Sequence, residues 1–171
     1  SFPDDWALVS NNLSSIGGCD FSDNVSQNQE KTIEEIQQNL QILNPENLPR
    51  EWGIAKLNLG NVYLFRSSGD RAENLEKAIE LYQEAGQVFS RKAFPSEWAS
   101  IQYGLGMVFR NRILGDRKEN IEQGIRYLQN ALEVDTRECD PEQWARIKHN
   151  LGKAYRDRRS GNFVENIRKA I

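Results

Sequence analysis

The sequence is poor in the residue types that most often carry catalysis and metal binding. Its 171 residues include one histidine, two cysteines and one methionine. A protein zinc site needs three or four ligands from histidine, cysteine or carboxylate side chains, and neither cysteine lies near His149 in the sequence. We therefore expect no metal, no cofactor and no catalytic residue, and we interpret His149 as a surface or groove residue.

Long apolar stretches and a leader segment are also missing. No run approaches the roughly 20 apolar residues that cross a bilayer. The first five residues, SFPDD, lack the basic start and apolar stretch of a secretion signal. Cys19 and Cys139 lie far apart, which is typical of two reduced thiols rather than of a disulfide framework. These features predict a cytoplasmic protein that makes no membrane contact.

Proline is scarce, and the few prolines reveal a repeat. Four of the five prolines, all four tryptophans and four asparagines each recur at a spacing of 46 residues. They are Pro3, Pro49, Pro95 and Pro141; Trp6, Trp52, Trp98 and Trp144; and Asn28, Asn74, Asn120 and Asn166. Because three residue types share one spacing, we predict an internal repeat. Its units cover residues 1–48, 49–94, 95–140 and 141–171, the last one truncated.

Each unit predicts a pair of helices. The Pro-x-x-Trp start suits a first helical turn, where the N–H that proline lacks is not needed, and Asp140 is placed to cap the helix that follows it. After a break at Gly69, Gly115 or Gly161, capping boxes predict a second helix. The boxes are Asn24 with Gln27, Asp70 with Glu73, Asp116 with Glu119, and Asn162 with Glu165. We expect the recurring asparagines to fix the turn through backbone hydrogen bonds.

The packing positions resemble a known repeat family. Leu59, Gly60 and Tyr63, followed by Ala78, Tyr82 and Ala85, resemble the tetratricopeptide signature. The resemblance implies an all-α fold, a right-handed α-solenoid of about eight helices. Gly60, Gly106 and Gly152 would then permit close helix approach, and the four tryptophans would pack between helices. The unit departs from the family in length, with 46 residues instead of about 34. Similar long units occur in bacterial, notably cyanobacterial, signalling proteins, where they often precede caspase-like (CHAT) protease or nucleotide-binding switch domains.

The resemblance implies a protein-interaction module, a scaffold or sensor segment rather than an enzyme. In such arrays a partner peptide lies in a concave groove lined by the first helix of each unit. The groove residues expected here are Asn12, Ile54, Asn58, Asn61, Tyr103, Met107, Arg110, Arg146, His149, Asn150, Lys153 and Arg156. Asn12, Asn58 and Asn150 recur at one position, where the family commonly uses an asparagine to bond the ligand backbone.

Charge is distributed unevenly among the units. Counted from Asp, Glu, Lys and Arg, units one to four carry −7, +1, −2 and +5, within a net charge of −3. The basic fourth unit favours an acidic peptide as the partner. Two alternatives stay open: an RNA-binding helical repeat that uses the basic unit, against which the acidic total argues, and head-to-tail self-association through uncapped ends. Because the sequence stops at Ile171, within a predicted helix, we also expect that it is part of a longer protein.

Overall fold

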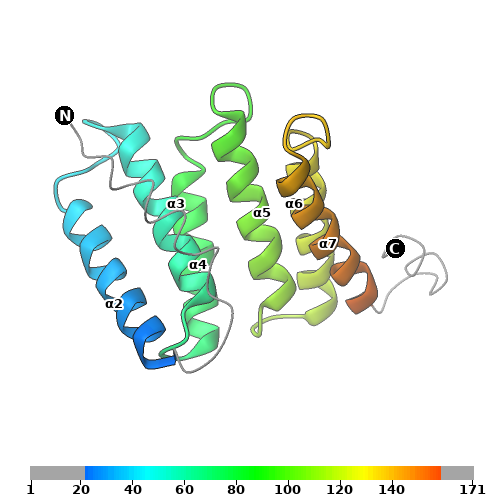
Figure 1. Ribbon diagram of the computed structural model, residues 1–171, viewed down its shortest axis with the longest axis horizontal. Coiled ribbons are helices and arrows are strands. Elements are labelled where there is room, and N and C mark those ends of the chain that lie inside the picture. Colours follow the sequence, from blue (N-terminus) through cyan, green and yellow to red (C-terminus); the bar gives the residue numbers. More distant parts are fainter. Residues whose placement is uncertain (1–21, 159–171) are drawn as a thin grey trace.

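The computed structural model describes residues 22–158, and within them the fold is all-α (Figure 1). Six helices follow one another: α2 (Ser22–Asn39), α3 (Pro49–Phe65), α4 (Arg71–Ala85), α5 (Pro95–Asn111), α6 (Arg117–Leu132) and α7 (Pro141–Asp157). They pack as adjacent antiparallel pairs, and α3, α5 and α7 begin 46 residues apart. The expected total of about eight helices is thus corrected to six in the part that the structure describes. The other two expected helices, at the ends of the chain, lie outside it.

The first helix of each pair begins at its proline. Pro49, Pro95 and Pro141 occupy the first turn of α3, α5 and α7, where the missing N–H costs no hydrogen bond. Asp140 caps α7 as predicted, because its carboxylate accepts a hydrogen bond from the Gln143 backbone N–H at 2.9 Å. The residues before α3 and α5 are apolar and provide no side-chain cap.

The turns between α3 and α4 and between α5 and α6 are built as the sequence predicts. Gly69 and Gly115 have φ angles of 74° and 80°, a left-handed conformation that glycine adopts without strain. The next residues, Asp70 and Asp116, accept hydrogen bonds from the backbone N–H three positions later and begin α4 and α6. The prediction for the first unit is wrong, since α2 is already helical from Ser22, ahead of the expected cap at position 24.

The recurring asparagines hold these turns. Asn74 and Asn120 are both 3% exposed. Their amide groups donate to the Ser68 and Leu114 carbonyl oxygens, each at 2.8 Å. A buried amide needs such partners to offset its lost hydration, so these two asparagines have the structural role that their spacing predicted.

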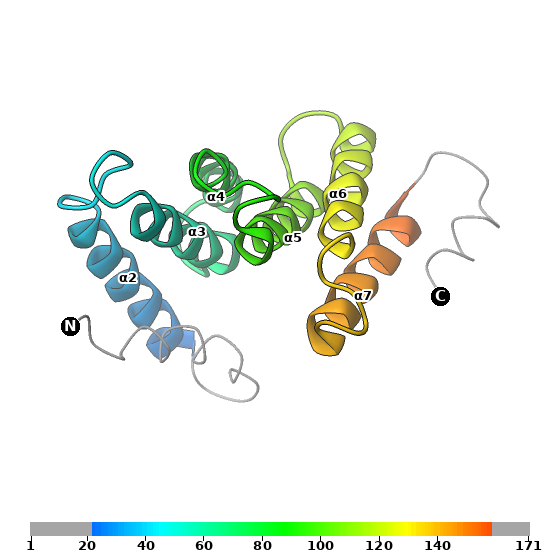
Figure 2. The same cartoon turned by 90° about the horizontal axis from the view of Figure 1, so that it is seen from above.

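The helices pack through the predicted apolar stripes. On α4 and in the loop after it, Leu75, Ile79, Tyr82, Ala85 and Phe89 are all buried, and so are Ile121, Ile125, Leu128 and Ala131 on α6. Each of these second helices contacts its own first helix and the first helix of the next pair. Figure 2 shows the resulting order along the molecule, from α2 at one end to α7 at the other.

Three equivalent ion pairs, spaced 46 residues apart, recur between consecutive pairs of helices. Arg66, Arg112 and Arg158, at the C-terminal ends of α3, α5 and α7, bind Glu30, Glu76 and Glu122 on the second helix of the preceding pair. All three shortest N···O distances are 2.7 Å. Arg66 and Arg112 each use two guanidinium nitrogens, the geometry that makes arginine–carboxylate pairs strong. We call this series the arginine–glutamate ladder.

Candidate polypeptide-binding surface

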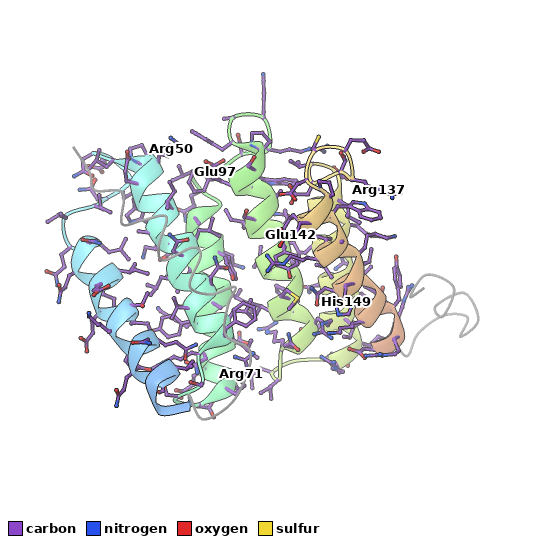
Figure 3. The ribbon with its side chains drawn as sticks, viewed as in Figure 1. Arg50, Arg71, Glu97, Arg137, Glu142 and His149 are labelled. Atoms are coloured by element: carbon purple, nitrogen blue, oxygen red, sulfur yellow. The ribbon has the colours of Figure 1, made fainter. Side chains whose placement is uncertain are left out.

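The candidate surface lies on the first helices α3, α5 and α7, which are neighbours in the fold. At their N-terminal ends Arg50 of α3 and Glu97 of α5 form an ion pair at 3.2 Å (Figure 3). Farther along, Ile54, Ser100 and Arg146 occupy equivalent positions on the three helices. Ile54 is half-buried and the other two are exposed, so this row of residues is reachable from solvent.

We call the place where two neighbouring first helices pack together a joint. At the joint between α3 and α5, the expected groove residue Asn61 already has a hydrogen-bond partner. Its side-chain oxygen accepts a 2.8 Å hydrogen bond from the Tyr82 hydroxyl. Tyr82 is fully buried, and its ring fills the space beside Gly60 of α3 and Gly104 of α5. Burial raises the pKa of this hydroxyl, so it stays protonated and keeps donating. Asn61 thus completes the packing of the joint.

At the joint between α5 and α7, the expected groove residues bind one another. Asn150, 7% exposed, donates to the Tyr103 hydroxyl oxygen and to the Arg146 carbonyl oxygen, both at 3.0 Å. Arg110 forms an ion pair with Asp157 at 3.3 Å. The recurring asparagine position therefore joins two helices here, and the Asn150 amide nitrogen is not free for a ligand backbone.

The Tyr103 hydroxyl can still donate a hydrogen bond, because the contact in this joint uses it only as an acceptor. It accepts from Asn150, and no hydrogen bond from it to a described residue is present. Burial raises its pKa, while Arg146, Arg110 and the Asn150 bond act in the opposite direction. The hydroxyl therefore stays protonated at neutral pH and has a proton to donate beside two guanidinium groups.

The remaining expected groove residues fall into four groups. Met107 is buried in the core. Asn58 is half-buried and makes no hydrogen bond to the described part of the chain. Arg146, His149 and Arg156 are exposed and Lys153 is half-buried, all on α7. Asn12 lies outside the described residues, as does Trp6.

Equivalent positions show what His149 and Arg156 would face. One repeat earlier, Tyr103 and Arg110 lie against α7 through Asn150 and Asp157. Two repeats earlier, the equivalents are Leu57 and Leu64, which are buried with residues of α5. In α7 this face is exposed, and the structure therefore places His149 (Figure 3) at the end of the described helix row rather than inside a groove between first helices.

The repeat residues differ in how deeply they pack. Gly60 and Gly106 lie tightly against Tyr82 and Leu128, the large residues of the second helices, and Gly152 is buried. Trp52 packs against the core cluster around α2 and α3. Trp98 and Trp144 are half-buried under the guanidinium groups of Arg91 and Arg137, with centroid distances of 5.6 and 5.7 Å, and they belong to none of the core clusters of the described residues.

The sequence interpretation missed the arginine–glutamate ladder, although its signal is present. Arg66, Arg112 and Arg158 recur every 46 residues, and their glutamate partners recur with the same spacing, 36 residues earlier. It also missed the contacts between neighbouring first helices, which join residues 47 positions apart, as in Tyr103 with Asn150. A search for opposite charges at a constant offset would have found the ladder.

Among the described residues no group of three or more histidine, cysteine or acidic side chains could hold a metal ion. Cys139 is an exposed free thiol in that part of the chain, and Cys19 lies outside it. None of the helices described above is long and apolar enough to cross a membrane.

No protein-family model, curated protein or solved structure matches this chain. The description of the protein as a repeat-like, all-helical fold rests on the 46-residue spacing and on the packing of its helix pairs.

Proposed function

We propose that this protein binds another polypeptide on the surface formed by α3, α5 and α7, and that it is a scaffold or sensor module without catalytic activity of its own. The observation that supports this most directly is the row Ile54, Ser100 and Arg146. It presents one apolar, one small polar and one basic side chain at equivalent positions on neighbouring helices. Asn58 adds a half-buried amide, whose nitrogen can donate to a peptide backbone and whose oxygen can accept from one.

The finer fold assignment belongs to the same proposal. We infer a tetratricopeptide-like right-handed solenoid, supported by glycine at the close helix contacts and by second helices that contact two first helices each. In repeat arrays of this kind, each unit contacts only its neighbours, which leaves an extended surface for partners. Such a surface places recognition on side chains of regular helices rather than on loops.

The proposal can be tested with peptides selected from a random display library against the whole chain. The binding site of a selected peptide would be mapped by amide chemical shifts in ¹⁵N-labelled protein. We expect the largest shifts on α3, α5 and α7, around Asn58, Ser100 and Arg146. Replacing the exposed Ser100 with tryptophan should block binding without unfolding the protein, because the new ring would stand in the row.

The matched control is Gln83→Trp, which puts the same ring at an exposed position on α4. It should leave binding unchanged. Shifts centred on α4 and α6, or equal loss of binding in both variants, would show that the first helices are not the binding surface.

A further inference from the structure

The face of α7 that no described helix covers carries a line of basic side chains. Arg146, His149, Lys153 and Arg156 follow one another at intervals of three, four and three residues, which places them on one side of a helix. They span about 15 Å at 1.5 Å per residue. The buried residues Ile147, Leu151 and Ala154 lie on the side that packs against α6. We call these four residues the α7 basic stripe.

Within the described residues, few acidic side chains lie close enough to offset the charge of the stripe. Arg156 is 65% exposed, and its only acidic neighbour in the described chain is Asp157, at 4.0 Å. Asp157 is closer to Arg110, at 3.3 Å. Arg146 and Lys153 form no ion pair within the described residues. The stripe is therefore a concentration of positive charge that an acidic partner would complement.

The molecule itself shows how such a face is covered by a helix. The positions of α5 that correspond to His149 and Arg156 are Tyr103 and Arg110, and α7 covers them. There a helix supplies one amide, Asn150, and one carboxylate, Asp157, seven residues apart on the same side. Two of the four stripe residues, His149 and Arg156, occupy the receiving positions of this contact, with Arg156 in place of Arg110.

From this juxtaposition we infer that the α7 basic stripe binds an acidic α-helix of a partner polypeptide, one that presents Asp or Glu at helical spacing as α7 presents Asp157 to α5. The inference rests on the proposed function and names the class of partner for one part of the surface. Binding by charge complementarity of this kind is fast and sensitive to salt.

The probe for this inference is an 18-residue alanine-rich helical peptide with glutamates at positions i, i+3, i+7 and i+10. A second peptide has glutamine at these positions, and a third distributes the four glutamates around the helix. Fluorescence anisotropy with the whole chain should show that the first peptide binds about tenfold more tightly than the other two, because several weak ion pairs form together. The preference should shrink as salt is raised.

Two triple variants of the protein complete the experiment. Arg146→Gln, Lys153→Gln and Arg156→Gln together should weaken binding of the first peptide about tenfold. The matched control, Lys92→Gln, Lys118→Gln and Arg126→Gln, removes the same charge from exposed positions elsewhere and should change binding less than twofold. Circular dichroism should show equal helix content in both.

Four results would overturn the inference. The glutamate and glutamine peptides could bind equally, or both triple variants could weaken binding equally. The stripe could instead bind a single-stranded RNA more tightly than any peptide. Finally, salt-sensitive dimers of the chain alone, abolished by the stripe variant, would assign the stripe to a second copy. Suppose that Ser100→Trp blocks peptide binding while the stripe variant has no effect. The proposed function is then supported, and only the inference that the partner is an acidic helix is wrong.

Discussion

The joint between α3 and α5 and the joint between α5 and α7 occupy equivalent places in the repeat, yet different residues fill them. In the first, the Tyr82 ring lies against Gly104. In the second, the counterpart of Tyr82 is the shorter Leu128, whose contact with Gly106 of α5 corresponds to that of Tyr82 with Gly60 of α3. Asn150 stands where the first joint has Gly104, and it bonds Tyr103.

The difference shows that one backbone arrangement accommodates two combinations of side chains, which are two solutions to packing the same joint. A large side chain on the second helix requires glycine on the next first helix, whereas a smaller one leaves room for a polar side chain. The first solution buries the Tyr82 ring, whose hydroxyl also donates to Asn61, and the second uses a hydrogen bond from the buried Asn150 amide to the half-buried Tyr103 hydroxyl. The α3/α5 joint should therefore contribute more to stability, since burial of a large side chain exceeds the net gain from one hydrogen bond.

The largest expected loss of stability comes from removing the Tyr82 ring from the joint between α3 and α5. Tyr82→Ala should lower the free energy of unfolding by about 3–5 kcal/mol, because it removes a fully buried ring and leaves Asn61 without its donor. Urea denaturation followed by circular dichroism measures this loss. Gln83→Ala, at the exposed neighbouring position, should change the free energy by less than about 0.5 kcal/mol. Equal effects at the two positions would contradict the assigned packing.

The next effect comes from placing the residue of the second joint into the first. A Cβ atom at position 104 would lie 2.7 Å from the Tyr82 hydroxyl oxygen. Gly104→Asn should therefore cost about 1–3 kcal/mol through overpacking. If the two joints are alternative solutions, adding Tyr82→Leu should recover part of that loss. A double-mutant cycle measures the coupling, and strictly additive losses would show that the ring and position 104 do not compete for space.

A smaller effect is expected from removing the polar contact of the second joint. Tyr103→Phe deletes the acceptor of the Asn150 amide but leaves its bond to the Arg146 carbonyl. The cost should be about 0.5–1.5 kcal/mol, visible as a lower urea midpoint. Tyr127→Phe serves as the control, since that half-buried tyrosine stacks on Phe109 and its hydroxyl makes no hydrogen bond in the described structure. A loss from Tyr127→Phe as large as that from Tyr103→Phe would argue against the Asn150 contact.

The smallest effect is expected where the ladder joins α2 to α3. Hydrogen bonds from Arg66 and then Ser68 hold the pKa of Glu30 below its ordinary value of 4.5. A depressed pKa in the folded state means that the stabilisation is present above about pH 4.5 and is lost as the pH falls through the lower folded-state value. The stability difference between wild type and Glu30→Gln should thus be largest near neutral pH and shrink in acid. A difference that grew on acidification would contradict this ion pair.

The helix starts and turns of single units could be predicted from the sequence, whereas the contacts at the joints between first helices could not. Prolines, glycines and asparagines at a constant spacing act through the backbone of their own turn, so Pro95, Gly115 and Asn120 predicted their helix start, turn and turn contact correctly. Asn61, Asn150 and Arg110 were predicted as ligand-facing because their positions on a single helix allow it. Their actual partners come from neighbouring helices, and those contacts depend on the size of residues such as Tyr82.

The same limit explains why His149 and Arg156 were predicted to line a groove. Helical periodicity assigned them to the first-helix face, but it does not state whether another helix covers that face. Only the comparison with Tyr103 and Arg110, which α7 covers, separates a residue between two units from one at the end of the described row. The repeat pattern alone therefore does not predict the exposure of the α7 basic stripe among the described residues.

The arginine–glutamate ladder has a consequence for how such a chain can change its length. Every 46-residue segment that spans one joint carries both the arginine that reaches back and the glutamate that receives the next arginine. Duplicating a segment would therefore reproduce the ion pair on both sides of the insertion. The joints impose the opposite condition: a copied Tyr82 would need a glycine opposite it, and a copied Asn150 would need a smaller residue in place of Tyr82. The recurring ion pairs thus permit the addition of units to the array, whereas the side-chain volumes at the joints restrict which units can be added.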